Sequence, residues 1–190
     1  QRNLPLVVIS LPQTGSSIYR KYLAGIFQGT RQQALLQVGF GAFLQDFLGR
    51  DEGLQRVASM DEADALREFG YLVPDRLVFR AEASPEQIDW PALVESQKLF
   101  WMRMEGLATA AVDPRNPAHG YHQYLLRLAS KVANNIGFAQ LEQGDVDGAM
   151  DSFHQARRLH PDNISALLNL WTIAQTKELP EAKEYEAEWE

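Results

Sequence analysis

The chain has 190 residues, 45% of them hydrophobic, and a formal net charge of −7 at pH 7. That length and apolar content suit one compact domain or two small ones, and the acidic balance argues against nucleic-acid binding, which needs clustered Lys and Arg to neutralise phosphates. Cysteine is absent, which excludes disulfides, thiol catalysis and cysteine-ligated metal sites.

The first half of the chain predicts a strand, several helices and a second strand. An apolar, β-branched run over residues 4–10 predicts a buried strand, and residues 76–82 alternate in part between apolar and polar side chains. Apolar residues at helical spacing predict helices over 18–28, 31–48 and 59–70. Strand, helices and strand follow the order of a parallel crossover, so we expect a small two-stranded α/β layer, although two strands do not fix its topology.

Some of these helices begin with recognisable caps. Thr30 and Gln33 have the spacing of a capping box, in which the glutamine side chain reaches back toward the cap residue. The Ser-Pro pair at 84–85 predicts another helix start. Pro91 is expected to break that helix into a short turn and a longer helix ending near residue 111.

Residues 113–120 have a composition typical of a linker, with two prolines, an asparagine and a glycine close together. We therefore divide the chain into a mixed α/β region over 1–112 and a helical region over 121–190. The fold class predicted for the whole chain is mainly α.

The segment 133–161 (ANNIGFAQLEQGDVDGAMDSFHQARRLHP) carries the most specific pattern. Ala149, Phe153 and Ala156 recur at steps of four and three, so they share one face of a helix. The two alanines allow a partner helix to approach closely, and the phenylalanine fills the space between them. Residues 144–145 predict the turn of a helical hairpin. Its structural core is predicted to be Ile136, Gly137, Ala149, Phe153, Ala156 and Pro161.

This segment resembles one tetratricopeptide repeat, a helix–turn–helix unit. Ala133 and Gln140 depart from the family pattern, which often has a bulky aromatic residue at the first position and tyrosine at the second. A single such repeat cannot bury its own apolar face, so neighbouring helices are expected. Residues 162–163 could cap a further helix carrying apolar residues up to Ile173, and a degenerate helix is expected after Pro180.

The resemblance implies an interaction or scaffolding module without catalysis. We expect its partner to be a protein or a peptide, including another domain of a longer chain. The contact residues are predicted on the first helix of the hairpin, at Asn134, Asn135, Phe138 and Leu141. The two asparagine amides can hold a peptide backbone, and a plain solvated role for them is the open alternative.

A looser resemblance covers more of the chain. A strand-containing region, a helix and the segments VANNIGFAQLEQG and DNISALLNL together look like the soluble C-terminal regions of large bacterial multipass membrane proteins. Several of those proteins resemble lipid-linked-sugar glycosyltransferases. The resemblance implies a place at the extracytoplasmic, periplasmic face of a membrane, with membrane association and catalysis in a larger parent protein.

A rival hypothesis places a small-ligand or enzymatic site in the strand–loop–helix of residues 10–18. Its side chains Gln13, Thr14, Ser16 and Ser17 could hold an anion at a helix N-terminus. The glycine motifs that bind phosphates and the GxSxG nucleophile elbow are both missing from the sequence. We therefore predict no catalytic residue, no cofactor and no metal.

Two further features have an ordinary and a sharper interpretation. The apolar stretch 34–48 predicts a core helix, with a face that rests on a membrane or a partner helix as the alternative. His119 and His122 have a spacing that occurs in metal sites, but we expect ordinary surface or interface histidines.

Overall fold

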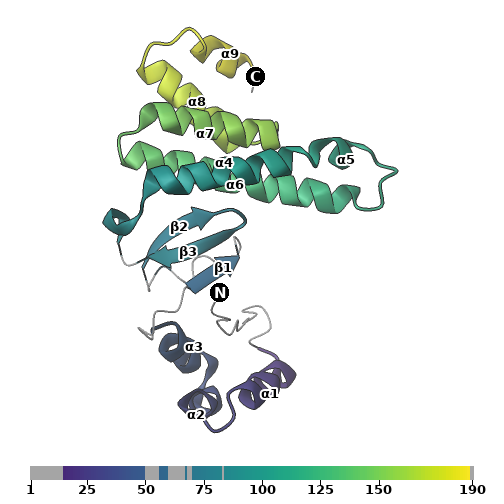
Figure 1. Cartoon of the computed structure of the whole chain (residues 1–190), viewed down its shortest axis with the longest axis vertical. Coiled ribbons are helices and arrows are strands. Elements are labelled where there is room, and N and C mark those ends of the chain that lie inside the picture. Colours follow the sequence, from purple (N-terminus) through teal and green to yellow (C-terminus); the bar gives the residue numbers. More distant parts are fainter. Residues whose placement is uncertain (1–14, 50–55, 60–66, 68–69, 83, 189–190) are drawn as a thin grey trace.

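The computed structural model describes residues 15–49, 56–59, 67, 70–82 and 84–188. The chain is mainly helical with a small sheet, so the predicted fold class is confirmed at that level. Figure 1 shows three tiers along the long axis of the molecule. Three short helices lie at one end, the sheet lies in the middle, and a stack of longer helices lies at the other end.

The N-terminal tier is a small helical unit with its own core. It consists of α1 (Ser17–Ile26), α2 (Arg31–Val38) and α3 (Phe40–Gly49). Its buried hydrophobic side chains are Leu23, Leu36 and Phe43. The Phe43 ring lies 5.3 Å from the Phe27 ring and 5.6 Å from the Phe47 ring, centroid to centroid, which adds favourable aromatic contacts.

The single helix predicted over 31–48 is wrong, because Gly39 is extended and separates α2 from α3. Glycine is a poor helix former, and the break lets the apolar faces of the two helices pack against each other. The hydrogen bonds of the predicted capping box also differ from the expected ones. Gln33 Oε1 accepts from the N–H of Gly29 at 2.9 Å, and the Thr30 hydroxyl donates to the carbonyl of Phe27 at 2.6 Å.

The sheet differs from the prediction in strand number and direction. β1 (Arg56–Ser59), β2 (Tyr71–Asp75) and β3 (Val78–Glu82) form an antiparallel sheet in the order β1-β3-β2. The expected two-stranded, parallel layer is therefore wrong. The strand predicted over 76–82 corresponds to β3, whereas residues 4–10 and most of the helix predicted over 59–70 lie outside the described residues.

The turn between β2 and β3 decides the strand direction. Only Arg76 and Leu77 connect the two strands, and such a short connection can join only antiparallel neighbours. Arg76 has a φ of 57°, as the first position of a tight hairpin turn often requires. Pro74 can be accommodated because β2 is an edge strand, where a missing N–H need not cost a ladder hydrogen bond.

The elements η3 (Pro85–Gln87), α4 (Trp90–Glu105) and α5 (Ala108–Val112) follow the sheet. The short turn and the longer helix expected around Pro91 are both present. Asp89 caps α4, since its carboxylate accepts from the N–H of Ala92 at 3.0 Å. The helix expected to continue to about residue 111 ends at Glu105, and α5 is separate from it.

The C-terminal tier contains α6 (His119–Glu142), α7 (Val146–Leu159), α8 (Ile164–Thr176) and α9 (Ala182–Ala187). Gly144, with a φ of 79°, forms the predicted turn of the α6–α7 hairpin. Ala149, Phe153 and Ala156 are fully buried. A Cβ placed on Gly137 would lie 2.7 Å from the Phe153 ring, so the close approach of the two helices requires glycine there.

Side-chain hydrogen bonds join α8 to the hairpin. The buried Ser130 hydroxyl of α6 donates to the carbonyl of Ala156 at 2.7 Å and accepts from Asn163 Nδ2 at 2.7 Å. Asn169 Nδ2 donates to Asn134 Oδ1 at 3.0 Å. Both bonds between α6 and α8 join residues in the same order along the chain, so the two helices run parallel, with α7 packed against each.

The linker predicted over 113–120 falls on the turn between α5 and α6 and includes the first two residues of α6. Trp101 of α4 and Ala111 of α5 belong to the same buried cluster as Phe153 of α7. Helices from both sides of the expected boundary therefore share one core. Among the described residues, no helix combines the length and the hydropathy that crossing a membrane requires.

Candidate partner-binding groove

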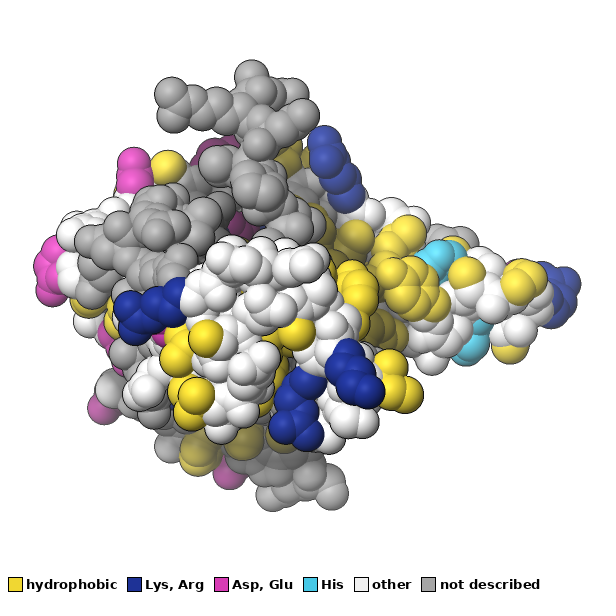
Figure 2. Space-filling model, turned by 90° about the horizontal axis from the view of Figure 1, so that it is seen from below, with side chains coloured by type: hydrophobic (Ala, Val, Ile, Leu, Met, Phe, Trp, Pro, Cys, Tyr) yellow, Lys and Arg dark blue, Asp and Glu magenta, His cyan; other side chains and the backbone are white. Residues whose placement is uncertain are grey.

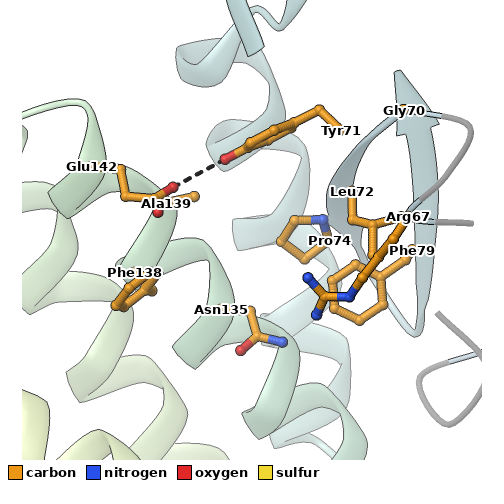
Figure 3. A pocket seen from close by; sticks show the side chains of 10 residues that line it. All are labelled: Arg67, Gly70, Tyr71, Leu72, Pro74, Phe79, Asn135, Phe138, Ala139 and Glu142. Carbon is orange, nitrogen blue, oxygen red and sulfur yellow. Dashed lines mark hydrogen bonds between the residues drawn. The ribbon is translucent and has the colours of Figure 1, made fainter. Parts of the chain in front are cut away.

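A groove of about 570 Å³ lies between the sheet and α6 (Figure 3). The sheet contributes Gly70, Tyr71, Leu72, Pro74 and Phe79. The helix contributes Asn135, Phe138, Ala139 and Glu142, and Arg67 completes the lining. We call this surface the β2–α6 groove.

The floor of the β2–α6 groove is apolar on its sheet side. Pro74 pairs with Phe79 across the sheet, and Leu72 lies two positions along β2, so the three side chains share one face. Phe138 lines the opposite wall, and 54% of its surface is exposed. Exposed aromatic rings beside apolar surface are typical of the central part of protein–protein interfaces.

The rim of the groove is polar and is joined across one end. The Tyr71 hydroxyl donates to Glu142 Oε2 at 3.1 Å, which links the first residue of β2 to the last residue of α6 (Figure 3). Partial burial, and then the hydrogen bond and negative charge of Glu142, raise the pKa of Tyr71. The Tyr71 ring also meets Trp90 edge-on at 6.4 Å. Asn135 lies about two turns of α6 from Glu142 and adds an amide to the lining of the groove (Figure 3).

The four predicted contact residues have different surroundings. Asn135 and Phe138 line the groove. Asn134 is partly buried and its amide oxygen accepts from Asn169 of α8, while Leu141 packs against the main core. The groove therefore brings together two of the four. The predicted core residues Ile136, Gly137, Ala149, Phe153 and Ala156 are buried, and Pro161 is exposed.

A second concave surface lies between α4 and the α6–α7 hairpin and encloses about 550 Å³. Its polar groups bond to one another: the buried Ser152 Oγ donates to the buried Gln140 Oε1 at 2.6 Å, and Gln140 Nε2 donates to Asp145 Oδ2 at 3.1 Å. Gln155 Nε2 likewise donates to Glu105 Oε1 at 2.7 Å. The bonds of Gln140 hold the α6–α7 hairpin together, and the Gln155–Glu105 bond joins α4 to it, so we assign these groups a structural role.

The rival site at residues 10–18 is only partly within the described residues, because Gln13 and Thr14 lie outside them. The Ser16 hydroxyl caps α1, accepting from the N–H of Tyr19 at 3.3 Å, and Ser17 is exposed. Neither serine lines the grooves described above.

The predicted histidine pair lies at the start of α6. His119 and His122 are half-buried, and the Nδ1 atom of each lacks a hydrogen-bond partner. The described residues contain no cluster of three or more His, Asp or Glu side chains arranged to hold a metal ion. His154 is also half-buried, and its ring lies 6.3 Å from that of Tyr185 on α9.

The sheet wall of the groove was missed in the sequence. Tyr71, Leu72 and Pro74 form an apolar run, but a proline within it argues against a central strand, and the turn after it lacks glycine. Glu142 looked like an ordinary charge at a helix end.

Comparisons with protein-family models, with curated proteins and with solved structures found no match to this chain.

Proposed function

We propose that the chain is a non-catalytic interaction module that binds an extended segment of a partner protein in the β2–α6 groove. The partner is a peptide, a protein or another domain of a longer chain. The observation that carries the proposal is the aromatic ring of Phe138, more than half exposed on the wall of the groove opposite the apolar face of Leu72 and Pro74. Leaving such a ring in water is unfavourable, and a partner that covers it gains the burial.

The polar side chains at the rim favour an extended peptide backbone as the occupant of the β2–α6 groove. Asn135 offers both an amide donor and an amide oxygen acceptor to the groove, and the Tyr71–Glu142 pair adds a hydroxyl oxygen and a carboxylate. The hairpin of α6 and α7 followed by a parallel α8 supports a tetratricopeptide-like arrangement, in which a helix face serves partner binding. Under this proposal α6 supplies one wall of the site and the sheet supplies the other.

Peptide selection tests the proposal. Random peptides displayed on phage are selected on the immobilised full chain, and their affinities are then measured for the wild type and for Phe138→Glu. We expect binding to weaken at least about tenfold, because the substitution removes the apolar anchor and places a charge over an apolar floor. Val112→Glu on α5 is the matched control, since that side chain is 74% exposed and lies outside the groove.

The control substitution should leave the affinities unchanged. Both altered side chains are exposed, so both variants should retain the wild-type circular dichroism spectrum and melting temperature. Selected peptides that bind Phe138→Glu as tightly as the wild type would place the interaction surface elsewhere and remove the β2–α6 groove as the site.

A further inference from the structure

The outward face of α1 carries a continuous row of exposed apolar side chains. Ile18, Tyr22 and Ile26 follow one another at intervals of four residues, which places them on one side of the helix. They are 79%, 61% and 47% exposed. Leu23, on a different side of the helix, is fully buried in the core of the N-terminal tier. We call these three side chains the α1 stripe.

The balance of charges in the N-terminal tier is opposite in sign to that of the whole chain. Residues 15–49 contain three basic side chains and one acidic side chain, whereas the whole chain has a net charge of −7. The acidic residue is Asp46, which pairs with Arg31 at 3.0 Å. Arg20 and Lys21 are both exposed on α1. By helical periodicity Lys21 flanks the stripe next to Ile18, whereas Arg20 points from the opposite side of the helix. Figure 2 shows this end of the molecule, where Lys and Arg side chains lie among hydrophobic ones.

From these features we propose that the α1 stripe docks on an anionic lipid surface. A short amphipathic helix lies in the membrane interface when its apolar side faces the acyl boundary and its basic side chains face anionic headgroups. Isoleucine supplies the apolar contact, and Tyr22 suits the interface because its ring is apolar and its hydroxyl is polar. The tier that carries the stripe lies at one end of the molecule, away from α9 at the other end (Figure 1).

The positive charge on α1 favours a lipid surface over a second copy of the chain as the partner that covers the α1 stripe. A two-fold contact through the stripe would bring Lys21 of one copy toward Lys21 of the other, because a two-fold interface uses one patch twice. The glutamate-rich α9 could attract those charges, but among the described residues from 177 to 188 none is an exposed large apolar side chain that could match the stripe. An anionic membrane matches both the charge and the apolar side chains.

Vesicle co-sedimentation of the full chain tests this proposal. The vesicles contain one part phosphatidylglycerol to two parts phosphatidylcholine, and vesicles of phosphatidylcholine alone serve as the comparison. We expect wild-type protein to sediment with the anionic vesicles and to remain in solution with the neutral ones. Ile18→Ser with Ile26→Ser should lower the partition coefficient about tenfold, and Arg20→Gln with Lys21→Gln should lower it at least about fivefold.

Two matched variants control for composition and charge. Val112→Ser with Tyr121→Ser removes exposed apolar side chains elsewhere, and Arg127→Gln with Lys131→Gln removes two exposed basic side chains from α6. Both should bind anionic vesicles like the wild type. The proposal is overturned if the wild type does not sediment with anionic vesicles, or if the α1 variants bind as well as the controls. It is also overturned if light scattering shows a wild-type oligomer that the α1 variants dissociate, because the stripe would then be a contact between copies.

Discussion

Gly137 is the residue on which the close contact of α6 and α7 depends. A methyl group there would meet two atoms of the Phe153 ring at 2.7 and 2.9 Å and the carbonyl of Ala149 at 3.0 Å. The ring is fully buried and the carbonyl belongs to a helix, so neither can move away freely. The smallest possible side chain is therefore a packing requirement of the hairpin.

We expect Gly137→Ala to lower the free energy of unfolding by about 1–3 kcal/mol, the range for adding a methyl group to a filled core. Urea unfolding followed by circular dichroism measures the change. Gly120→Ala on the same helix is the matched control, because no atom lies within 4 Å of the added methyl group, and alanine is the better helix former. Equal stability of the two variants would show that the hairpin is looser than described.

The imidazole of His154 makes the free energy of unfolding depend on pH. Burial, and then the positive charge of Arg158, lower the pKa of His154 below its usual value. The unfolded chain therefore binds a proton at this residue at a higher pH than the folded chain does. As the pH falls below about 6.5, the unfolded chain takes up a proton at this histidine before the folded chain does, and this proton uptake favours the unfolded state. The contribution to stability is complete above that pH and is lost as the pH falls toward the lowered folded pKa.

Replacing His154 by asparagine should flatten this part of the pH profile. The free energy of unfolding is measured for the wild type and for His154→Asn at about pH 7.5 and about pH 5.5, and the wild-type loss should exceed the loss in the variant. The other histidines are common to both proteins, so the difference isolates this side chain. Identical losses would contradict the inferred shift.

At the scale of elements, one buried glutamine fastens the β2–β3 hairpin to α4. Gln97 is fully buried, and its Nε2 donates to Asp75 Oδ1 at 2.9 Å while its Oε1 accepts from the N–H of Arg76 at 2.9 Å. Gln97→Leu would leave the N–H of Arg76 without this partner and remove one bond from Asp75, which keeps its ion pair with Arg80, and should cost about 1–3 kcal/mol. The substitution should increase the rate of amide hydrogen exchange more in β2 and β3 than in α6 and α7. Ser96→Ala is the control, since its hydroxyl bonds only to the carbonyl of Leu93 within α4, and unchanged exchange in Gln97→Leu would show that other contacts hold the sheet.

The whole molecule separates the two proposed binding surfaces by tier. The elements β2 and α6, which line the groove, lie where the middle tier meets the helical stack, and α1, which carries the stripe, lies in the tier at the other end of the sheet (Figure 1). The groove presents an apolar floor with a hydrogen-bonding rim, whereas the stripe combines apolar and basic side chains. If both proposals hold, the chain could rest on an anionic surface through α1 and bind a protein segment at the groove at the same time.

The sequence alone determined most helices, because a helix is formed by contacts within a few residues of each other. The spacing of Ala149, Phe153 and Ala156 predicted the packed face of α7, and the prolines and cap residues marked helix starts. Gly39 escaped the same reasoning, since glycine inside an apolar helical pattern can continue the helix or break it. Phe138 and Asn135 were found as candidate contacts through the helix that carries them.

Only the tertiary structure decided the sheet and the groove. Strand pairing joins segments that carry no local sign of one another, and the antiparallel order followed from a two-residue turn without glycine. The bond from Tyr71 to Glu142 spans 71 positions of sequence, so no local pattern could place these residues at one site. The direction in which an exposed helix face points is likewise set by what packs on its other side. Leu23 of α1 is held in a core, and this left Ile18, Tyr22 and Ile26 in solvent.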